Sequence, residues 1–219
     1  MNERSPAKVL EQGLEQMSLE TTAEARSQLL KYIDLLAKWN HTYNLTAVTN
    51  KQQMVIRHLL DSLSICRYIP YKKGGRILDV GSGPGLPGLP LAMVFPQLEF
   101  VLLDSRRKQI RFIIQAISQL GLDNVSVEQA RVEAYQPDVL FDLVLSRAFS
   151  SMADFFAATA RLCLPGGQLL AMKGRLPEYE LKQLPPGCRV DTLDSINVPG
   201  LQAERHVVLL SQKSTANQV

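Results

Sequence analysis

Several features are scarce in this sequence, and each absence excludes a class of protein. Only three cysteines occur, Cys66, Cys163 and Cys188, and they form no Cys-x-x-Cys pair and no cluster with histidine. This spacing predicts three buried, reduced thiols and argues against a disulfide framework or a metal site. No apolar run approaches a membrane span, and the polar start at residues 1–6 is unlike a signal peptide. We therefore expect a soluble, cytoplasmic protein that binds no metal.

An excess of charge of one sign is also missing. The 219 residues include 24 Lys and Arg against 21 Asp and Glu, which gives a net charge of +3 without long blocks of one sign. Such a balance permits a nucleic-acid partner without requiring one. With 46% apolar residues the chain can form a full core, and its length fits one domain with a small extension.

What the sequence does contain is one dense cluster of glycine and proline, in residues 76–90. Apolar residues predict a strand over 76–80 and a helix over 89–95, with a tight loop between them. Glycine permits positive φ and a close approach to the main chain, and the helix start presents free peptide N–H groups. Open α/β sheets bind ligands at loops of this kind, so we expect a ligand here.

The spacing of this loop distinguishes between nucleotide ligands. It reads Gly81-x-Gly-x-Gly85, so the third glycine of a dinucleotide fingerprint would fall on Leu86, and no Gly-Lys-Ser/Thr follows. Three prolines remove backbone donors, which suits a pyrophosphate poorly and disfavours a nicotinamide dehydrogenase. Together with Asp79 in the strand and Asp104 at the end of the next, the loop resembles the first two motifs of class I S-adenosylmethionine-dependent methyltransferases.

The remaining segments alternate between helical and extended patterns. Before the loop we expect a weak helix over 6–20, a helix capped by Thr21 or Thr22 that continues to Trp39, a polar interruption over 40–46, and a helix over 52–69. After the loop, the pattern predicts strands over 99–104, 125–127, 141–146 and 168–173, an antiparallel pair over 189–198 and 205–211, helices over 106–120, 152–163 and 176–184, and a turn over 165–167.

This alternation predicts an α/β fold with a seven-stranded, mostly parallel sheet and helices on both faces. The architecture is the Rossmann-like one of class I S-adenosylmethionine methyltransferases, with an N-terminal helical extension. We expect the extension to occupy residues 1–70, the methyltransferase core residues 71–213, and a disordered tail residues 214–219.

Two strand ends supply candidate contacts to a nucleoside. A carboxylate at Asp104 can accept both hydroxyls of an adenosine ribose, whereas the other interpretation is a helix-capping acid. We favour the ligand role because Ser105 can supply the cap. In the class I arrangement the loop after the third strand flanks the adenine, so main-chain groups of Val132 and Glu133 are candidates, with an ordinary turn as the alternative.

Arg147 ends the fourth strand, where such enzymes place the residues that face the transferred methyl group. The Asn/Asp-Pro-Pro-Tyr/Phe sequence of an exocyclic-amine methylase is missing, and Cys163, the potential nucleophile of a carbon methylase, falls on a predicted helix. Arg147 carries donors only and cannot act as a general base. A site without a base fits a ring nitrogen such as that of guanine or adenine, with alignment as the source of catalysis. A salt bridge is the alternative role for Arg147.

Basic residues near these strand ends are candidates for RNA contacts. Arg106 and Arg107 begin a helix against its dipole, which a bound phosphate would offset; solvated surface charge is the alternative. Lys173 ends the fifth strand and is also a candidate for catalysis. No aromatic interleaving of the single-strand type is evident. The candidate RNA-binding residues are Arg57, His58, Arg106, Arg107, Lys173, Arg205 and His206.

Seven motifs in this order resemble the bacterial small-subunit ribosomal RNA methyltransferase G family, also called glucose-inhibited division protein B. The resemblance covers about residues 25–210 and is highly specific. The motifs are Lys38-Trp-Asn-x-x-Tyr-Asn-Leu-Thr46, Arg57-His-x-x-Asp-Ser62, Asp79-Val-Gly-Ser-Gly-Pro-Gly-Leu-Pro-Gly88, Leu103-Asp-Ser105, Ser146-Arg-Ala-Phe149, Lys173-Gly174 and Glu204-Arg-His206.

The resemblance implies N7 methylation of a guanine, at position 527, in 16S ribosomal RNA, with S-adenosylmethionine as the donor. It implies the small ribosomal subunit as partner, and we expect a monomer. It places the cofactor against residues that match Gly81, Leu86, Val132, Glu133 and Arg147. With the loop and strand end, the candidate cofactor residues are Gly81, Gly83, Leu86, Asp104, Val132, Glu133 and Arg147, and the candidate catalytic residues are Arg147 and Lys173.

Besides a nicotinamide dehydrogenase, which the position of the third glycine disfavours, two alternatives stay open. One is a protein of methyltransferase fold that binds RNA or assists assembly without turnover, which a cofactor titration would distinguish. The other is a methyltransferase for a different RNA or a protein, which only the family resemblance disfavours.

Overall fold

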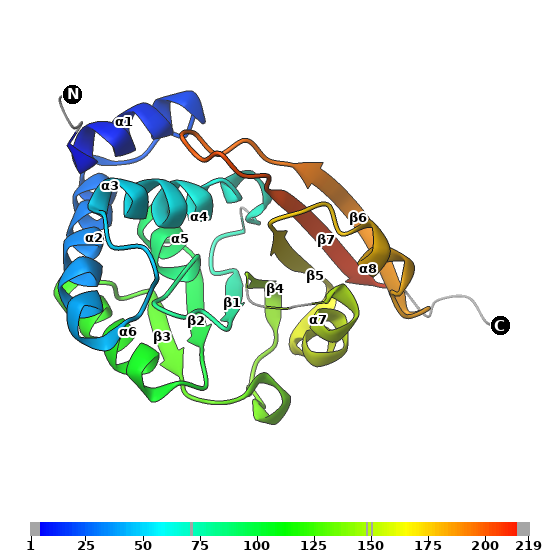
Figure 1. Cartoon of the computed structure of the whole chain (residues 1–219). Coiled ribbons are helices and arrows are strands. Elements are labelled where there is room, and N and C mark those ends of the chain that lie inside the picture. Colours follow the sequence, from blue (N-terminus) through cyan, green and yellow to red (C-terminus); the bar gives the residue numbers. More distant parts are fainter. Residues whose placement is uncertain (1–4, 71, 148, 150, 214–219) are drawn as a thin grey trace.

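A seven-stranded sheet forms the centre of the computed structural model, which describes residues 5–70, 72–147, 149 and 151–213 (Figure 1). The strand order is β3-β2-β1-β4-β5-β7-β6; β7 is antiparallel to both of its neighbours, β5 and β6, and the other four pairings are parallel. This confirms the predicted mostly parallel sheet. The strands are β1 (Arg76–Val80), β2 (Glu99–Leu103), β3 (Val125–Glu128), β4 (Phe141–Ser146), β5 (Cys163–Lys173), β6 (Cys188–Ser195) and β7 (His206–Gln212).

Helices cover both faces of the sheet because successive strand residues point to opposite sides. In β1, Ile77 joins one apolar cluster and Leu78 joins the other. The first cluster lies under α1 (Pro6–Gln16), α2 (Ala23–Tyr43), α3 (Lys51–Met54), η1 (Val55–Leu60), α4 (Asp61–Leu63), η2 (Cys66–Tyr68), α5 (Gly88–Val94) and α6 (Arg107–Leu120). The second lies under η3 (Val132–Ala134), α7 (Met152–Thr159), η4 (Ala160–Leu162) and α8 (Glu178–Lys182).

Helix α2 continues further than the sequence predicted. Thr22 caps its start by accepting a hydrogen bond from the Ala25 N–H (3.0 Å), and Asn44 ends it in the left-handed region at φ 48°. The polar interruption predicted over 40–46 is confirmed from Asn44 onward but is wrong for residues 40–43, because Asn40 lies buried in the last turn of the helix. Its side chain accepts from the Thr46 N–H (2.8 Å) and so closes the helix end.

The second predicted N-terminal helix contains an irregularity. Segments α3, η1 and α4 follow one another without a break, and η1 is a π-helical turn. Such turns re-aim side chains and are frequent at functional sites. Here the turn contains Arg57 and His58 and leads into Asp61.

Three local expectations were wrong. The N-cap of α6 is Arg106 and not Ser105, with no side-chain cap. Cys163 begins strand β5 and does not lie on a helix, and the expected turn over 165–167 is an irregular part of that same strand. The strand persists because β4 continues to pair with it after a shift in register between Phe141 and Leu143. The three cysteines are buried and free, as predicted.

The N-terminal helices and the sheet share one apolar core, which includes Leu29 from α2, Leu59 from η1 and Leu102 from β2. The division of the chain after residue 70 stays a prediction. The tail expected over 214–219 lies outside the described residues. None of the helices in the described part of the chain is long and apolar enough to cross a membrane.

Candidate active site

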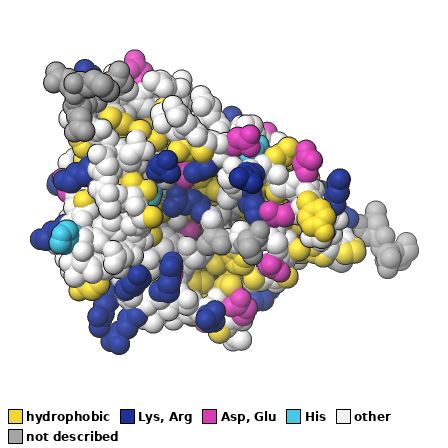
Figure 2. Space-filling view, in the orientation of Figure 1, with side chains coloured by type: hydrophobic (Ala, Val, Ile, Leu, Met, Phe, Trp, Pro, Cys, Tyr) yellow, Lys and Arg dark blue, Asp and Glu magenta, His cyan; other side chains and the backbone are white. Residues whose placement is uncertain are grey.

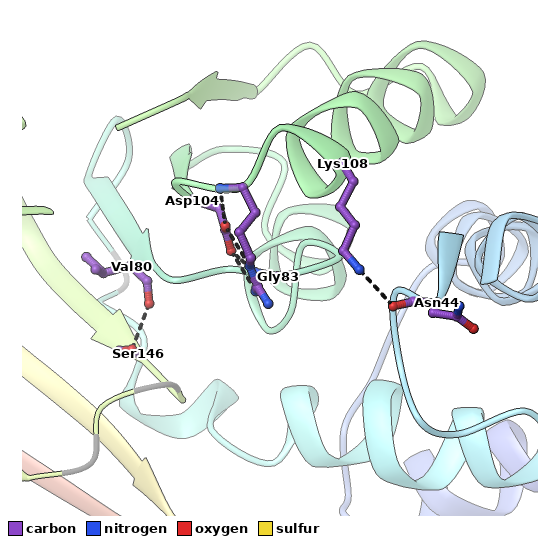
Figure 3. A network of polar contacts seen from close by, with 7 residues as sticks. Asn44, Val80, Gly83, Asp104, Lys108 and Ser146 are labelled. Atoms are coloured by element: carbon purple, nitrogen blue, oxygen red, sulfur yellow. Dashed lines mark hydrogen bonds and ion pairs between the residues drawn. The ribbon is translucent and has the colours of Figure 1, made fainter. Parts of the chain in front are cut away.

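The glycine loop after β1 adopts a conformation that requires glycine. Gly81, Gly83 and Gly85 have φ values of 70°, 56° and 88°, in the region that disfavours other residues. The Gly83 N–H donates to Oδ2 of Asp104 (2.9 Å), and Figure 3 shows this contact joining the loop to the end of β2. The loop is therefore held at the carboxyl end of the parallel strands, where α/β sheets bind ligands.

Asp104 lies buried at this strand end, with 4% of its surface exposed. Besides the Gly83 N–H, its carboxylate accepts from the Arg106 backbone N–H (2.8 Å) and from Nε and Nη2 of the Arg106 side chain (both 3.1 Å). Asp104 thus satisfies the backbone at the start of α6, the role that we expected of Ser105. Hydrogen bonding to this carboxylate is also the main reason that the pKa of Arg106 is raised.

A cavity of about 370 Å³ opens beside Asp104. Arg161 donates to the carbonyl of Val132 (2.6 Å) and so fixes the turn η3, which begins without a side-chain cap. The first N–H groups of an uncapped turn have no partner within it and are available to a ligand. The cavity is lined by Val80, Gly81, Leu103, Asp104, Ser105, Arg106, Ala130, Arg131, Val132, Glu133 and Phe149.

A second cavity, of about 480 Å³, meets the first at Gly81. Its floor is the glycine loop through Leu86, and its walls come from η1, α4 and the ends of β4, β5 and β7. Figure 2 shows Lys and Arg side chains gathered around a hollow near the middle of this face. The polar residues that line it are Arg57, His58, Asp61, Ser82, Arg147, Lys173 and Arg205.

Asp61 joins two arginines inside the second cavity. Its carboxylate is 3% exposed and accepts from Nη1 of Arg147 (2.9 Å) and from Nε of Arg205 (2.6 Å). The three residues come from α4, the end of β4 and the start of β7. Sequence reasoning missed Asp61 as a site residue; an acid on an apolar helix, in the segment Arg57-His-x-x-Asp-Ser62, was the available signal.

His58 is buried beside this group and is held by one hydrogen bond. Its Nε2 pairs with Oγ1 of Thr46 (3.0 Å), whereas Nδ1 has no hydrogen-bond partner among the described residues. Burial, and next the positive charge of Arg147, lower the pKa of His58 to about 4. His58 is therefore neutral at pH 7 and adds no charge to the cavity.

Asp79 lies behind the glycine loop, fully buried in β1. Its Oδ2 accepts from the Gly88 N–H (2.8 Å) and positions the start of α5. Burial raises the pKa of Asp79 to about 7, although the Gly88 hydrogen bond and Arg147 act in the opposite direction. Ser146 donates to the Val80 carbonyl (2.7 Å; Figure 3), which ties β4 to β1 at the point where the two cavities meet.

The structure brings some predicted site residues together and separates others. Lys173 lines the second cavity, and its ammonium pairs with Glu180 (2.8 Å). Arg106 lines the first cavity. Arg107 lies outside both cavities, on the exposed start of α6, and His206 is buried at the start of β7 with 8% of its surface exposed.

Comparison with known sequences identifies the family of this chain. The family model for rRNA small subunit methyltransferase G (GidB) matches residues 25–208. The ribosomal RNA small subunit methyltransferase G of Nitrosococcus oceani is 50% identical over 92% of this chain and 93% of its own length. The chain belongs to the rRNA small subunit methyltransferase G family. A further member, from Chromobacterium violaceum, is 49% identical over 91% of this chain and 94% of its own.

Solved structures share the fold of this methyltransferase G family member at much lower sequence identity. A SAM-dependent methyltransferase from Aquifex aeolicus superposes with a TM-score of 0.56 at 21% identity, over 72% of this chain and 92% of its own. TrmN from Thermus thermophilus gives a TM-score of 0.58, also at 21% identity, over 69% of this chain and 48% of its own. These similarities confirm the class I methyltransferase fold.

Proposed function

We propose that this protein transfers a methyl group from S-adenosylmethionine to N7 of a guanine in 16S ribosomal RNA. The observation that carries the proposal is the pair of cavities that meet at Gly81. The first offers a buried carboxylate and an uncapped turn to a nucleoside, and the second offers basic side chains to an RNA. The name of its family, rRNA small subunit methyltransferase G, agrees with one cavity for a methyl donor and one for an RNA.

The residues of the first cavity fit the adenosyl part of the cofactor. Asp104 is positioned to accept the ribose hydroxyls once the Arg106 side chain, itself 57% exposed, swings away from it. Val132 and Glu133 offer main-chain groups to the adenine edge, and Gly81 permits a close approach of the cofactor to the main chain. Gly83, Leu86 and Arg147 are the further candidates for its methionine part. The bound cofactor supplies an electrophilic methyl group.

The second cavity suits an acceptor that needs no deprotonation. Arg147 and Lys173 carry donors only, and the Asp61 carboxylate is occupied by two guanidinium groups. His58, whose pKa burial lowers to about 4, is a weak base. Guanine N7 has an in-plane lone pair and no proton to lose, so alignment and a polar, desolvated setting are sufficient. Arg147 cannot grip O6 and N7 together without blocking the acceptor, so it holds O6, a phosphate or the cofactor carboxylate.

The partner under this proposal is the small ribosomal subunit or its RNA, bound in the cytoplasm by a monomer. Positive residues in the second cavity (Arg57, Lys173 and Arg205) and at the start of α6 (Arg106 and Arg107) would contact backbone phosphates. His58, which is neutral, and His206, which is buried, are the other candidates for contacts to the RNA. The helical extension, residues 1–70, would shape the RNA side of a core that spans 71–213.

Labelled S-adenosylmethionine tests the proposal directly. The protein is incubated with naked 16S ribosomal RNA or with small-subunit particles, and the labelled nucleotide is mapped. We expect label on N7 of one guanine, and we expect Arg147→Ala to abolish transfer while the protein stays folded. Label on protein, or on another base atom, would contradict the substrate; cofactor binding without transfer would favour a binding or assembly protein.

A further inference from the structure

An aromatic and basic surface adjoins the first turn of α6, outside both cavities. Trp39 and Tyr43 lie one turn apart on α2 and stack on each other, with ring centroids 5.1 Å apart and an interplanar angle of 29°. Trp39 also makes an edge contact with Phe112 of α6, at 5.7 Å. Tyr43 forms the outer end of this stack, and 44% of its surface is exposed.

Lys108 attaches α6 to this end of α2. Its ammonium donates to the carbonyls of Tyr43 and Asn44, both at 3.2 Å. Figure 3 shows Lys108 reaching from α6 toward Asn44, and the same helix start follows Asp104, which binds the glycine loop. The outer face of Tyr43 is therefore held in a defined position relative to the loop that lines both cavities.

Two arginines adjoin the α6 residues that contact this stack, and neither has an acidic partner among the described residues. Arg107 and Arg111 precede Lys108 and Phe112 in α6, are exposed, and form no ion pair with any described residue. The first turn of α6 contains no acidic residue, so the helix dipole adds to their positive potential. Figure 2 shows Lys and Arg side chains gathered at the lower left, over α6.

The segment 44–48 connects this surface to the second cavity. It begins at the end of α2 beside Tyr43, its Thr46 pairs with His58, and its Val48 lines the cavity. A strand that enters the cavity can thus leave it across this short segment and reach the Tyr43 ring.

We propose that Tyr43, stacked on Trp39 and flanked by Arg107 and Arg111, binds a nucleotide next to the target in the same RNA strand. An exposed aromatic ring offers stacking to an unpaired base, and neighbouring arginines offer charge to its phosphates. The proposal rests on the proposed function, because the occupant is the RNA that supplies the target. The sequence alone showed no such pattern, since the aromatic and basic residues belong to different helices.

Substitution of Tyr43 tests the stacking contact. In the transfer assay, with whichever form of small-subunit RNA accepts the methyl group, Tyr43→Ala should raise KM for RNA roughly 5- to 150-fold, the range for loss of one stacked base. We expect kcat and the affinity for S-adenosylmethionine to stay near wild type, and Tyr43→Phe to restore KM. The matched control is Tyr179→Ala, which removes another exposed tyrosine, 74% exposed, on α8.

Salt dependence tests the arginines. Each phosphate contact to single-stranded RNA contributes about 0.7 to the slope of log K against log salt concentration. Arg107→Ala combined with Arg111→Ala should lower that slope by about 1.4. Trp39 is the only tryptophan of the chain, so binding of naked small-subunit RNA should also change its emission.

Several results would overturn the proposal that Tyr43 binds a nucleotide of the RNA. One is an unchanged KM for RNA in Tyr43→Ala, and another is an equal rise of KM in Tyr43→Phe or in Tyr179→Ala. A third is an unchanged slope of log K against log salt concentration in the variant that lacks both Arg107 and Arg111. If the wild type transfers no methyl group, the proposed function fails separately. Filter binding of 16S ribosomal RNA to wild type and Tyr43→Ala, each with its melting temperature recorded, then tests the Tyr43 site by itself. Equal RNA affinities of the two proteins would overturn it.

Discussion

At the scale of single residues, two carboxylates organise the site in different ways. Asp104 binds backbone groups of the glycine loop and of α6, and its remaining partner is the exposed side chain of Arg106. Asp61 binds only side chains, and both partners are arginines of the second cavity. The first can therefore exchange partners with a ligand, whereas the second holds charged groups in place.

Replacement of Asp104 should weaken cofactor binding. A hydrogen bond to a charged group contributes roughly 1.5–3 kcal/mol, so Asp104→Ala should lower the affinity for S-adenosylmethionine roughly 10- to 100-fold. Calorimetric titration measures this, with Asp123→Ala, an exposed acid after α6, as the control. Equal affinities for the two variants would remove Asp104 from the cofactor site.

Replacement of Asp61 should reduce methyl transfer and stability together. Asp61→Asn keeps the shape of the side chain but leaves Arg147 and Arg205 without their carboxylate, at a cost of about 1–3 kcal/mol in unfolding free energy. We expect transfer to fall at least roughly 10-fold, because Arg147 loses its orientation. Asp34→Asn, which breaks the exposed pair with Lys51, should cost less than about 1 kcal/mol and leave transfer unchanged. Full activity in Asp61→Asn would show that the bridge is dispensable.

At the scale of elements, the join between β1 and α5 is tightly packed at Gly88. A Cβ atom on Gly88 would lie 2.8 Å from Oδ2 of Asp79 and 3.0 Å from Cδ1 of Leu102. Neither neighbour is free to move, since Asp79 is fully buried and Leu102 belongs to the core. Any side chain at position 88 therefore requires Asp79 or Leu102 to shift.

Gly88→Ala should destabilise the protein by about 1–3 kcal/mol through overpacking. For a chain of this size that corresponds to a fall of roughly 2–12 °C in melting temperature. Gly187→Ala is the matched control, because nothing lies within 4 Å of its Cβ position. If both variants melt at the same temperature, Asp79 and Leu102 can move to make room for a Cβ atom at position 88.

At the scale of the whole molecule, two buried groups give the stability opposite dependences on pH. The pKa of Asp79 is raised from 3.8 to about 7, so its contribution to stability is complete below pH 3.8 and is lost as the pH rises through 7. The pKa of His58 is lowered from 6.5 to about 4, so its contribution is complete above pH 6.5 and is lost as the pH falls through 4. Between pH 4 and 6.5 the two slopes oppose each other.

Replacing either residue should remove its share of the pH dependence of the unfolding free energy and leave that of the other. Relative to wild type, Asp79→Asn should gain stability above pH 7 and lose this advantage as the pH falls toward 4. His58→Gln should instead gain relative stability as the pH falls from 6.5 to 4. Denaturant unfolding at a series of pH values measures both differences. A pH-independent difference for either variant would contradict the pKa shift of that residue.

Local patterns predicted much of the architecture correctly. Alternating apolar runs predicted all seven strands to within a few residues, except that β5 begins earlier at Cys163. Such predictions succeed because periodicity reflects which faces of an element are buried. Helix ends were less predictable. Asn40 and Ser105 show why: a polar side chain caps, breaks or leaves a helix according to partners that are distant in sequence.

The sequence by itself determined the fold class, the glycine loop and the resemblance to the methyltransferase G family, because these depend on local spacing and residue type. Only the tertiary structure decided that Asp61 joins Arg147 to Arg205 and that Tyr43 lies against the basic start of α6. In each case the partners come from elements far apart in the chain. Strand order and helix packing set their distance, and no local pattern encodes it.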